Sequence, residues 1–237
     1  MIIKEPININ FSLEELKPLR DKIASSIRDS IIEGKIKPGE RLMEPEVAKT
    51  LGVSRTPLRE AFLQLESEGF VKVFPRKGAL VTETSLKDAE ETYLIKGALE
   101  GIAAKLSAVN ITDPEINILI GLNNHMEKIA QSHEKDYKLF LEINARFHQK
   151  IYNASGNEKL IKTINLLRNQ TLRYNFIFLS LLSHLDESVE EHYSIIDALK
   201  NHNADEAERL IKNHSETARQ ALCNYMKNQF ELSQVNT

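Results

Sequence analysis

Residues 52–71 read GVSRTPLREAFLQLESEGFV, and this stretch decides the fold of the N-terminal part of the chain. Gly52 permits the backbone angles that a tight turn between two helices needs. After the turn, apolar residues recur at helical spacing and form one stripe: Leu58, Ala61, Phe62 and Leu65. The stretch therefore predicts a turn followed by a helix that is anchored by one face.

The N-terminal end of this predicted helix is polar and positively charged. Ser54 or Thr56 can cap the helix, and Pro57 is tolerated in the first turn, where its missing N–H has no intrahelical partner. Arg55 and Arg59 lie one turn apart and flank the apolar stripe. Guanidinium groups beside hydroxyls and free N–H groups at a helix N-terminus suit contact with bases and phosphates. We therefore expect a DNA-reading helix here.

The flanking segments complete a small DNA-binding domain. Periodic apolar residues predict helices over 18–33 and 44–51, with a turn at 37–40 between them. After Gly69 the pattern changes to two short strands, 70–74 and 79–82, joined by the turn Pro75-Arg76-Lys77-Gly78. Three helices followed by a hairpin with a basic tip predict a winged helix-turn-helix, in which Gly78 allows close approach to the nucleic acid.

The rest of the chain is predicted to be helical, which makes the fold mainly α, a winged helix-turn-helix followed by an all-α antiparallel bundle. Ser85 is a good N-cap for the first long helix, and Ser155-Gly156-Asn157 stops the third. The predicted helices are 85–109, 113–130, 135–154, 158–182, 186–202 and 203–228. We divide the chain into an N-terminal arm (1–16), a DNA-binding domain (17–83), a helical effector-binding and dimerisation domain (84–230) and a polar tail (231–237).

The charge is unevenly distributed, although the net charge is only −3. Residues 17–82 hold 13 lysines and arginines against 9 acidic residues, whereas residues 83–237 hold 17 against 22. A basic domain joined to an acidic one indicates different partners for the two. No run of 18 apolar residues and no secretory signal are present, so we expect a cytoplasmic protein with no membrane span. The single cysteine, Cys223, excludes an internal disulfide and is expected to pack in a helix.

Three of the seven histidines share helix faces with apolar residues. His148 lies on the face of Ile151, His192 on the face of Ile195, and His214 on the face of Ile211. A single inward histidine is usually a core residue, but three from different helices can converge on one ion in a bundle core. Asn144 lies one turn before His148 on the same face. The same histidines could belong to a zinc hydrolase, although no well-placed general base accompanies them.

Several motifs resemble those of a known family. The segments GKIKPGERL (34–42), LGVSRTPLREAFLQLESEGFV (51–71) and RKGALV (76–81) resemble the DNA-binding domain of the GntR family of bacterial transcription regulators. The segments NARFHQKIYNASGN (144–157) and EEHYSIIDAL (190–199), with His214 after them, resemble the all-helical effector domain of the FadR subgroup, called FCD. Together the two resemblances cover nearly all of the chain after residue 16.

The resemblance implies roles for particular residues. Base and phosphate contacts fall to Ser54, Arg55, Thr56, Arg59, Lys77 and Gly78. Arginine can bind guanine O6 and N7 with two hydrogen bonds, and lysine attracts phosphate. A divalent metal would be held by Asn144, His148, His192 and His214. Asn144 stands where an aspartate is common, so the site would be more positive. Three imidazoles and one oxygen favour Zn²⁺ or Ni²⁺, with Mn²⁺ as a further candidate.

The effector pocket is less clear from the sequence. In the family, a metal or an arginine often binds a metabolite that carries a carboxylate. Lys96 stands where this resemblance places an arginine, which keeps the charge and loses the bidentate geometry. A surface lysine is an equal alternative. Arg168 and Arg173 could also face the pocket, and the sequence selects neither.

These observations predict a homodimeric transcription regulator that is not an enzyme, with repression as the default. Its partners would be a palindromic double-stranded DNA operator and a small organic acid bound beside a metal. The alternatives are a metal-dependent enzyme with an accessory DNA-binding head and an architectural DNA-binding protein without an effector.

Overall fold

The computed structural model describes residues 18–83, 85–171, 174 and 185–235, with only the backbone for 229–235. The described residues form two compact units that meet in the sequence between Thr82 and Glu83. We describe each unit separately. Among the described residues, no helix is both long enough and apolar enough to cross a lipid bilayer.

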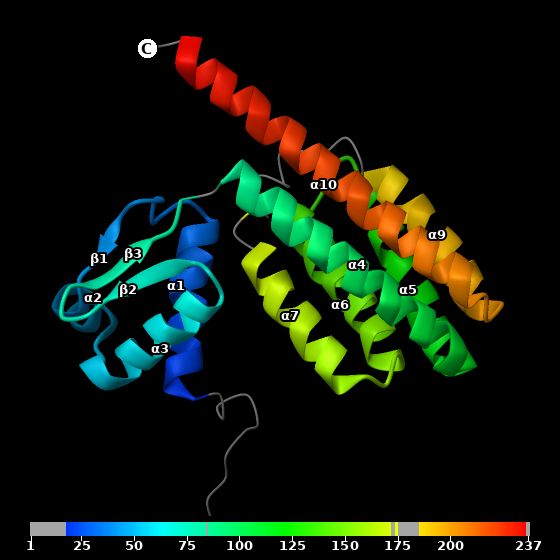
Figure 1. Cartoon of the computed structure of the whole chain (residues 1–237), viewed down its shortest axis with the longest axis horizontal. Coiled ribbons are helices and arrows are strands. Elements are labelled where there is room, and N and C mark those ends of the chain that lie inside the picture. Colours follow the sequence, from blue (N-terminus) through cyan, green and yellow to red (C-terminus); the bar gives the residue numbers. More distant parts are fainter. Residues whose placement is uncertain (1–17, 84, 172–173, 175–184, 236–237) are drawn as a thin grey trace, which may run out of the picture. The chain divides into compact units, whose positions relative to one another are not determined.

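The first unit is a winged helix-turn-helix, as predicted (Figure 1). In its described part β3 lies between β1 and β2, and both pairs are antiparallel. The elements in chain order are α1 (Leu19–Ile32), β1 (Arg41–Leu42), α2 (Glu44–Leu51), α3 (Arg55–Ser67), β2 (Val71–Phe74) and β3 (Gly78–Val81).

The core of this unit confirms the predicted stripe. All four of its residues are at most 1% exposed, and α3 contacts α1, which buries Ile23 and Ile27. The Arg28 guanidinium donates to both carboxylate oxygens of Glu68, at 2.6–2.8 Å, and so connects α1 to the C-terminal end of α3. Gly52 ends α2 with φ 65°, the left-handed conformation that the turn requires.

The second unit is a bundle of helices, which confirms the predicted mainly α fold. Its elements are α4 (Leu86–Asn110), α5 (Asp113–Ala130), α6 (Tyr137–Ala154), α7 (Glu158–Thr171), α9 (Leu185–Lys200) and α10 (Ala204–Val235). The helices α4 and α10 run side by side (Figure 1). Gly97 and Gly101 of α4 allow this approach, because a Cβ at either would lie within 3.0 Å of Ser215 or Lys212 on α10.

The structure differs from the sequence predictions at two elements. β1 was not predicted, because two residues carry no periodic signal and the strand exists only by pairing with β3. Helix α10 continues to Val235, so the expected polar tail is helical over 231–235; nothing in ELSQV breaks a helix. The predicted arm (1–16), Arg173 and most of the 172–182 part of the predicted fourth long helix lie outside the described residues.

Candidate functional site

The N-terminal end of α3 is open to solvent. Ser54 precedes the helix, and the side chains of Ser54, Arg55 and Thr56 are all exposed. Ser54 makes no capping hydrogen bond, so its hydroxyl remains available to another partner. This end therefore presents the groups that contact bases and phosphates in helix-turn-helix proteins.

Arg59 has a second partner that the sequence did not indicate. Its side chain is exposed, yet its Nε lies 2.8 Å from Oε2 of the buried Glu44 at the start of α2. The pair joins the two helices of the helix-turn-helix and holds one edge of the guanidinium. A charge-assisted hydrogen bond of this kind orients the arginine as well as stabilising the domain.

The wing carries its basic residues at the tip, between β2 and β3. The side chain of Lys77 is exposed, and its backbone N–H donates to the Phe74 carbonyl at 3.0 Å. Gly78 is buried with φ 76°, and a Cβ there would lie 2.1 Å from the carbonyl oxygen of Leu42. The fold itself thus requires glycine at this position, because β1 passes directly against the start of β3.

In the second unit, the three inward histidines come together as predicted. His148 of α6, His192 of α9 and His214 of α10 offer ligand atoms that all lie within 4.8 Å of one another. Their ring centroids are separated by 5.3, 5.1 and 4.8 Å. His192 is fully buried, and His148 is 9% exposed. Three imidazoles at this spacing could hold a divalent metal ion.

Buried atoms of two of these histidines and of the nearby Asn144 lack partners. Asn144 Oδ1, His148 Nδ1 and His192 Nε2 are buried, and none has a hydrogen-bond partner in the part of the chain that the structure describes. Buried polar atoms are rarely left in this state, because each loses its hydrogen bonds to water without replacement. A metal ion accepts electron pairs from these same atoms, so the residues fit one.

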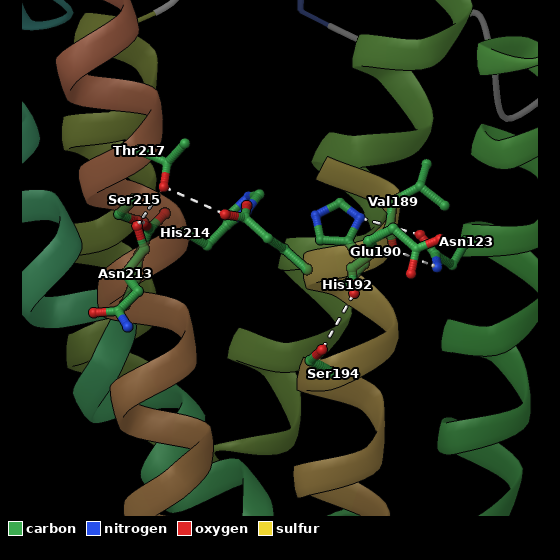
Figure 2. Close-up of polar contacts among 11 residues, drawn as sticks. Asn123, Val189, Glu190, His192, Ser194, Asn213, His214, Ser215 and Thr217 are labelled. Carbon is green, nitrogen blue, oxygen red and sulfur yellow. Dashed lines mark hydrogen bonds and ion pairs between the residues drawn. The ribbon is translucent and has the colours of Figure 1, made fainter. Parts of the chain in front are cut away.

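Hydrogen bonds to Asn123 set which nitrogen of His192 carries the proton (Figure 2). The Asn123 amide nitrogen donates to the Val189 carbonyl at 3.1 Å, and a carbonyl only accepts. The amide oxygen therefore faces His192 Nδ1 at 3.2 Å, so Nδ1 must hold the proton. The lone pair is left on Nε2, the atom that points to the cluster without a partner.

Glu191 has the same effect on His214. Its Oε2 lies 2.6 Å from His214 Nδ1, and an ionised carboxylate only accepts. Nδ1 therefore donates, which leaves Nε2 as the ligand atom when the ring is neutral. Metal-binding histidines generally donate their second nitrogen to such a partner, because this fixes the ring and raises its basicity.

The electrostatics keep two of the rings neutral. Burial is the main reason that the pKa of His192 lies well below its ordinary value, and His214 and His148 lower it further. Burial likewise lowers the pKa of His148, with additional contributions from His214, Lys96 and Arg168. Only a neutral imidazole can donate a lone pair to a metal, so both rings are ready to do so at neutral pH.

Lys96 belongs to a buried network, and its charge acts on His148. Its Nζ is 2.8 and 2.9 Å from the two carboxylate oxygens of Glu100, and the same carboxylate accepts from Ser215 at 2.6 Å and from Tyr152. Burial alone would raise the pKa of Glu100, but the charge of Lys96 and these hydrogen bonds hold it below its ordinary value. Lys96 is thus already paired within the protein.

Sequence reasoning missed the residues that surround the ligands. Asn123 was detectable, since it is a polar residue between Leu119 and Met126 on the buried face of α5. Glu100 was also detectable, because it follows Lys96 by four residues. The role of Glu191 was not detectable, because its position one residue before His192 does not indicate that it contacts His214 on α10.

Comparison with known proteins agrees with this architecture. The family model of bacterial regulatory proteins of the gntR family matches residues 19–81, and that of the FCD domain matches residues 91–217. A probable D-xylose utilization operon transcriptional repressor from Paenarthrobacter nicotinovorans is 31% identical over 199 residues, which cover 82% of this chain and 86% of the relative. The HTH-type transcriptional repressor RspR of Escherichia coli is 28% identical over 218 residues, covering 90% and 95%.

A solved structure is also similar. It is E. coli McbR/YncC, with a TM-score of 0.72 and 26% identity, and the match covers 87% of this chain and 98% of that one. The two domain matches together span most of the sequence and follow each other in the order of the two units. The chain therefore belongs to the GntR family of bacterial transcription regulators and carries an FCD domain after its DNA-binding domain.

Proposed function

We propose that this transcription regulator is a homodimeric repressor that binds a palindromic operator and responds to a small organic acid bound beside a metal ion. The observation that carries the proposal is the convergence of three histidines and unpaired buried donor atoms in the FCD domain. The coupling is reciprocal: if the acid changes the affinity of the protein for its operator by some factor, then the operator changes the affinity of the protein for the acid by the same factor. Repression is the default because two relatives are named as repressors.

The N-terminal domain supplies the operator contacts in this proposal. Arg55 and Arg59 would read base edges, with Ser54 and Thr56 beside them. At the wing, Lys77 would contact phosphate, and the neighbouring Gly78, expected from the sequence to admit DNA, instead makes room for β1 and would contribute by holding the wing in place. The exposure of the first three residues of this surface, 54–56, supports these roles.

An apolar face of α4 supports the homodimer. Leu94, Ile95, Ile102 and Val109 are 44–67% exposed, and at 100° per residue they fall within an arc about 100° wide. Exposed apolar residues that gather on one face mark an interaction site more often than scattered ones do. A second copy related by a two-fold axis would cover this face with the same face and place two DNA-binding domains on related half-sites.

The metal would be held by Asn144, His148, His192 and His214, with Zn²⁺ or Ni²⁺ preferred and Mn²⁺ next. When bound, the ion would supply a Lewis-acidic position for a carboxylate oxygen of the effector. Asn123 and Glu191 hold two of the rings in the required tautomer. Lys96 would add positive charge to the pocket, reduced by its ion pair with Glu100.

Elemental analysis tests the metal. Wild-type protein should contain about one divalent ion per chain, and a His148→Ala, His192→Ala double variant should contain none. His125→Ala, which removes an exposed histidine of α5, is the matched control. Wild-type protein that stays free of metal after incubation with Zn²⁺ would end this part of the proposal.

Selection from a random DNA library tests the rest. The full-length protein should enrich a palindrome, and a light-scattering measurement of the complex should give two chains for each DNA duplex. Enrichment of an asymmetric site by single chains would contradict the dimer and the palindrome together.

A further inference from the structure

The exposed face of α3 extends beyond the residues that the sequence predicts to contact DNA. At about 100° per residue, the three side chains that lie within about 30° of the direction opposite the buried stripe are those of Thr56, Glu60 and Leu63. All three are exposed. Thr56 is predicted to contact DNA, so the two residues that follow it on the same face should meet the same partner.

Leu63 is an apolar residue in the middle of this face. It is 57% exposed, the largest exposed fraction among the large apolar side chains of the described part of the first unit. Isolated exposed leucines are common on protein surfaces, but this one lies on the helix face that a helix-turn-helix turns toward the major groove. It follows Thr56 by seven residues, which is about 10 Å along the helix axis and about three base pairs of DNA. Leu63 thus lies within reach of base pairs beside those that Thr56 meets.

The neighbours of Leu63 indicate the kind of surface that it meets. On the exposed side of α3 they are Arg59, Glu60 and Ser67, which are all polar or charged. Docking of an apolar protein surface would need several apolar residues together, and this face of α3 offers one. The major groove of DNA is a polar surface whose principal apolar group is the C5 methyl of thymine. A single leucine within a polar face matches that surface.

Glu60 gives the same face a second group that can distinguish bases. Its carboxylate is exposed and makes no ion pair and no hydrogen bond with another described residue. A carboxylate that faces DNA is repelled by the phosphates, so it weakens binding wherever no base offers it a donor. In the major groove, the N4 amino group of cytosine is the donor from which a glutamate accepts. Glu60 should therefore favour sites with a cytosine at this point and disfavour the others.

We propose that Leu63 and Glu60 are specificity-determining residues of this regulator. Leu63 contacts the methyl group of a thymine, and Glu60 accepts a hydrogen bond from the amino group of a cytosine in the same half-site. The inference rests on the proposed contact between α3 and the operator. It adds two residues to that contact and names the chemical group that each of them recognises.

A purely structural role for these residues predicts a different result. Both side chains are exposed, so Leu63→Ala and Glu60→Gln should leave the melting temperature of the DNA-free protein unchanged. Their effect should instead appear in the choice of DNA sequence. A lowered melting temperature with an unchanged choice of sequence would assign the residue to the fold and overturn its proposed role.

Operators in which deoxyuridine replaces thymidine test Leu63, because they lack only a methyl group. Full-length wild-type protein first selects its site from a random DNA library, and each thymidine of that site is then replaced in turn. At one position the replacement should weaken wild-type binding about fourfold, the loss expected when one methyl group is no longer buried. Leu63→Ala should bind both forms of this operator equally. Leu19→Ala, which shortens a leucine that is 51% exposed on α1, should keep the wild-type difference.

Selection from the same library with Glu60→Gln tests the carboxylate. The wild type should prefer cytosine at one position of each half-site, and the variant should lose this preference. The variant should also bind non-operator DNA more tightly, because it carries one negative charge less beside the phosphates. Asp29→Asn, which removes an exposed carboxylate of α1, is the matched control and should behave like the wild type.

The inference fails for Leu63 if no thymidine of the site shows a methyl effect, or if the effect persists in Leu63→Ala. It fails for Glu60 if the wild type shows no cytosine preference, or if Glu60→Gln retains it. Failure of the proposed operator contact is recognised separately, because Arg55→Ala would then bind the selected site normally. Loss of binding by Arg55→Ala with no effect of the other two substitutions would remove this inference alone.

Discussion

Asn123 and His192 form a pair in which the amide decides the tautomer of the imidazole. The amide nitrogen of Asn123 is committed to the Val189 carbonyl at 3.1 Å, so its oxygen accepts the Nδ1 proton of His192 at 3.2 Å. Both side chains are fully buried. The pair leaves the lone pair of His192 on Nε2 and directs it to the other two histidines.

We therefore expect Asn123→Ala to weaken metal binding although it removes no ligand. Loss of an outer-shell hydrogen bond commonly costs about 10- to 100-fold in metal affinity. Competition with a chelator of known affinity measures the change. Asn117→Ala, at an exposed position on the same helix, should match the wild type. An unchanged affinity in Asn123→Ala would show that the tautomer is set elsewhere.

Periodicity predicted those parts of the protein that local sequence determines. The buried stripe of α3 and the inward histidines each follow from helical spacing, so their faces could be assigned in advance. The capping Gly52 was also predictable, because a left-handed residue at a helix end is a local requirement. Apolar periodicity and turn residues are local signals, so the helix-turn-helix and its wing could also be predicted from the sequence.

The remaining features depend on which helix faces meet in the fold. The hydrogen bond from Arg168 to the Ala145 carbonyl depends on the way α7 lies against α6, and the sequence of neither helix indicates this. The pairing of His214 with Glu191 likewise depends on the packing of α9 and α10. Strand β1 exists only because β3 is beside it.

The two arginines of α3 should respond differently to substitution. Arg55→Ala should abolish operator binding and leave the stability of the DNA-binding domain unchanged, because the side chain is exposed and makes no ion pair with a described residue. Arg59→Ala should weaken binding and also destabilise the domain, since Glu44 is 9% exposed and would lose its partner. We expect the free energy of unfolding of the domain to fall by about 1–3 kcal/mol.

Electrophoretic mobility shift and urea denaturation measure the two effects. Lys22→Ala, at an exposed position of α1 outside the helix-turn-helix, serves as the control for loss of positive charge. Normal operator binding by Arg55→Ala would remove this residue from the DNA interface.

The exposed face of α4 predicts a variant that fails to dimerise. Ile102→Asp places a charge among Leu94, Ile95 and Val109, where burial against a second copy would leave the charge unpaired. Light scattering should then give a single chain, and operator affinity should fall. Ile118→Asp, at an isolated exposed position on α5, should remain dimeric. A dimeric Ile102→Asp would place the interface on another surface.

Glu100 predicts a dependence of stability on pH. Its pKa is lowered on folding, so the unfolded chain binds more protons at this site, and stability falls as the pH decreases. The contribution of Glu100 to the free energy of unfolding is complete when the pH is above 4.5, the ordinary pKa of the group. It is lost as the pH falls through the lower pKa that Glu100 has in the folded protein. At pH 7, Glu100→Gln should cost about 3–5 kcal/mol, because Lys96 loses its buried partner.

Urea denaturation of the metal-free protein between pH 7 and pH 3.5 measures this difference. The difference in the free energy of unfolding between the wild type and Glu100→Gln should narrow as the pH falls below 4.5. Both proteins retain the same histidines, so titration of those rings cancels in the comparison. A gap that stays constant over the range would contradict the lowered pKa.

Gly78 separates a requirement of the fold from a requirement of DNA binding. A methyl group at this position meets the Leu42 carbonyl oxygen at 2.1 Å, and φ 76° is unfavourable for alanine. Gly78→Ala should therefore destabilise the DNA-binding domain by at least about 1–2 kcal/mol even without DNA. Lys77→Ala should leave stability unchanged and reduce the dependence of operator affinity on salt by about one phosphate contact. Thermal unfolding and salt titrations distinguish the two variants, and an equally stable Gly78→Ala would mean that β1 can move away from the wing.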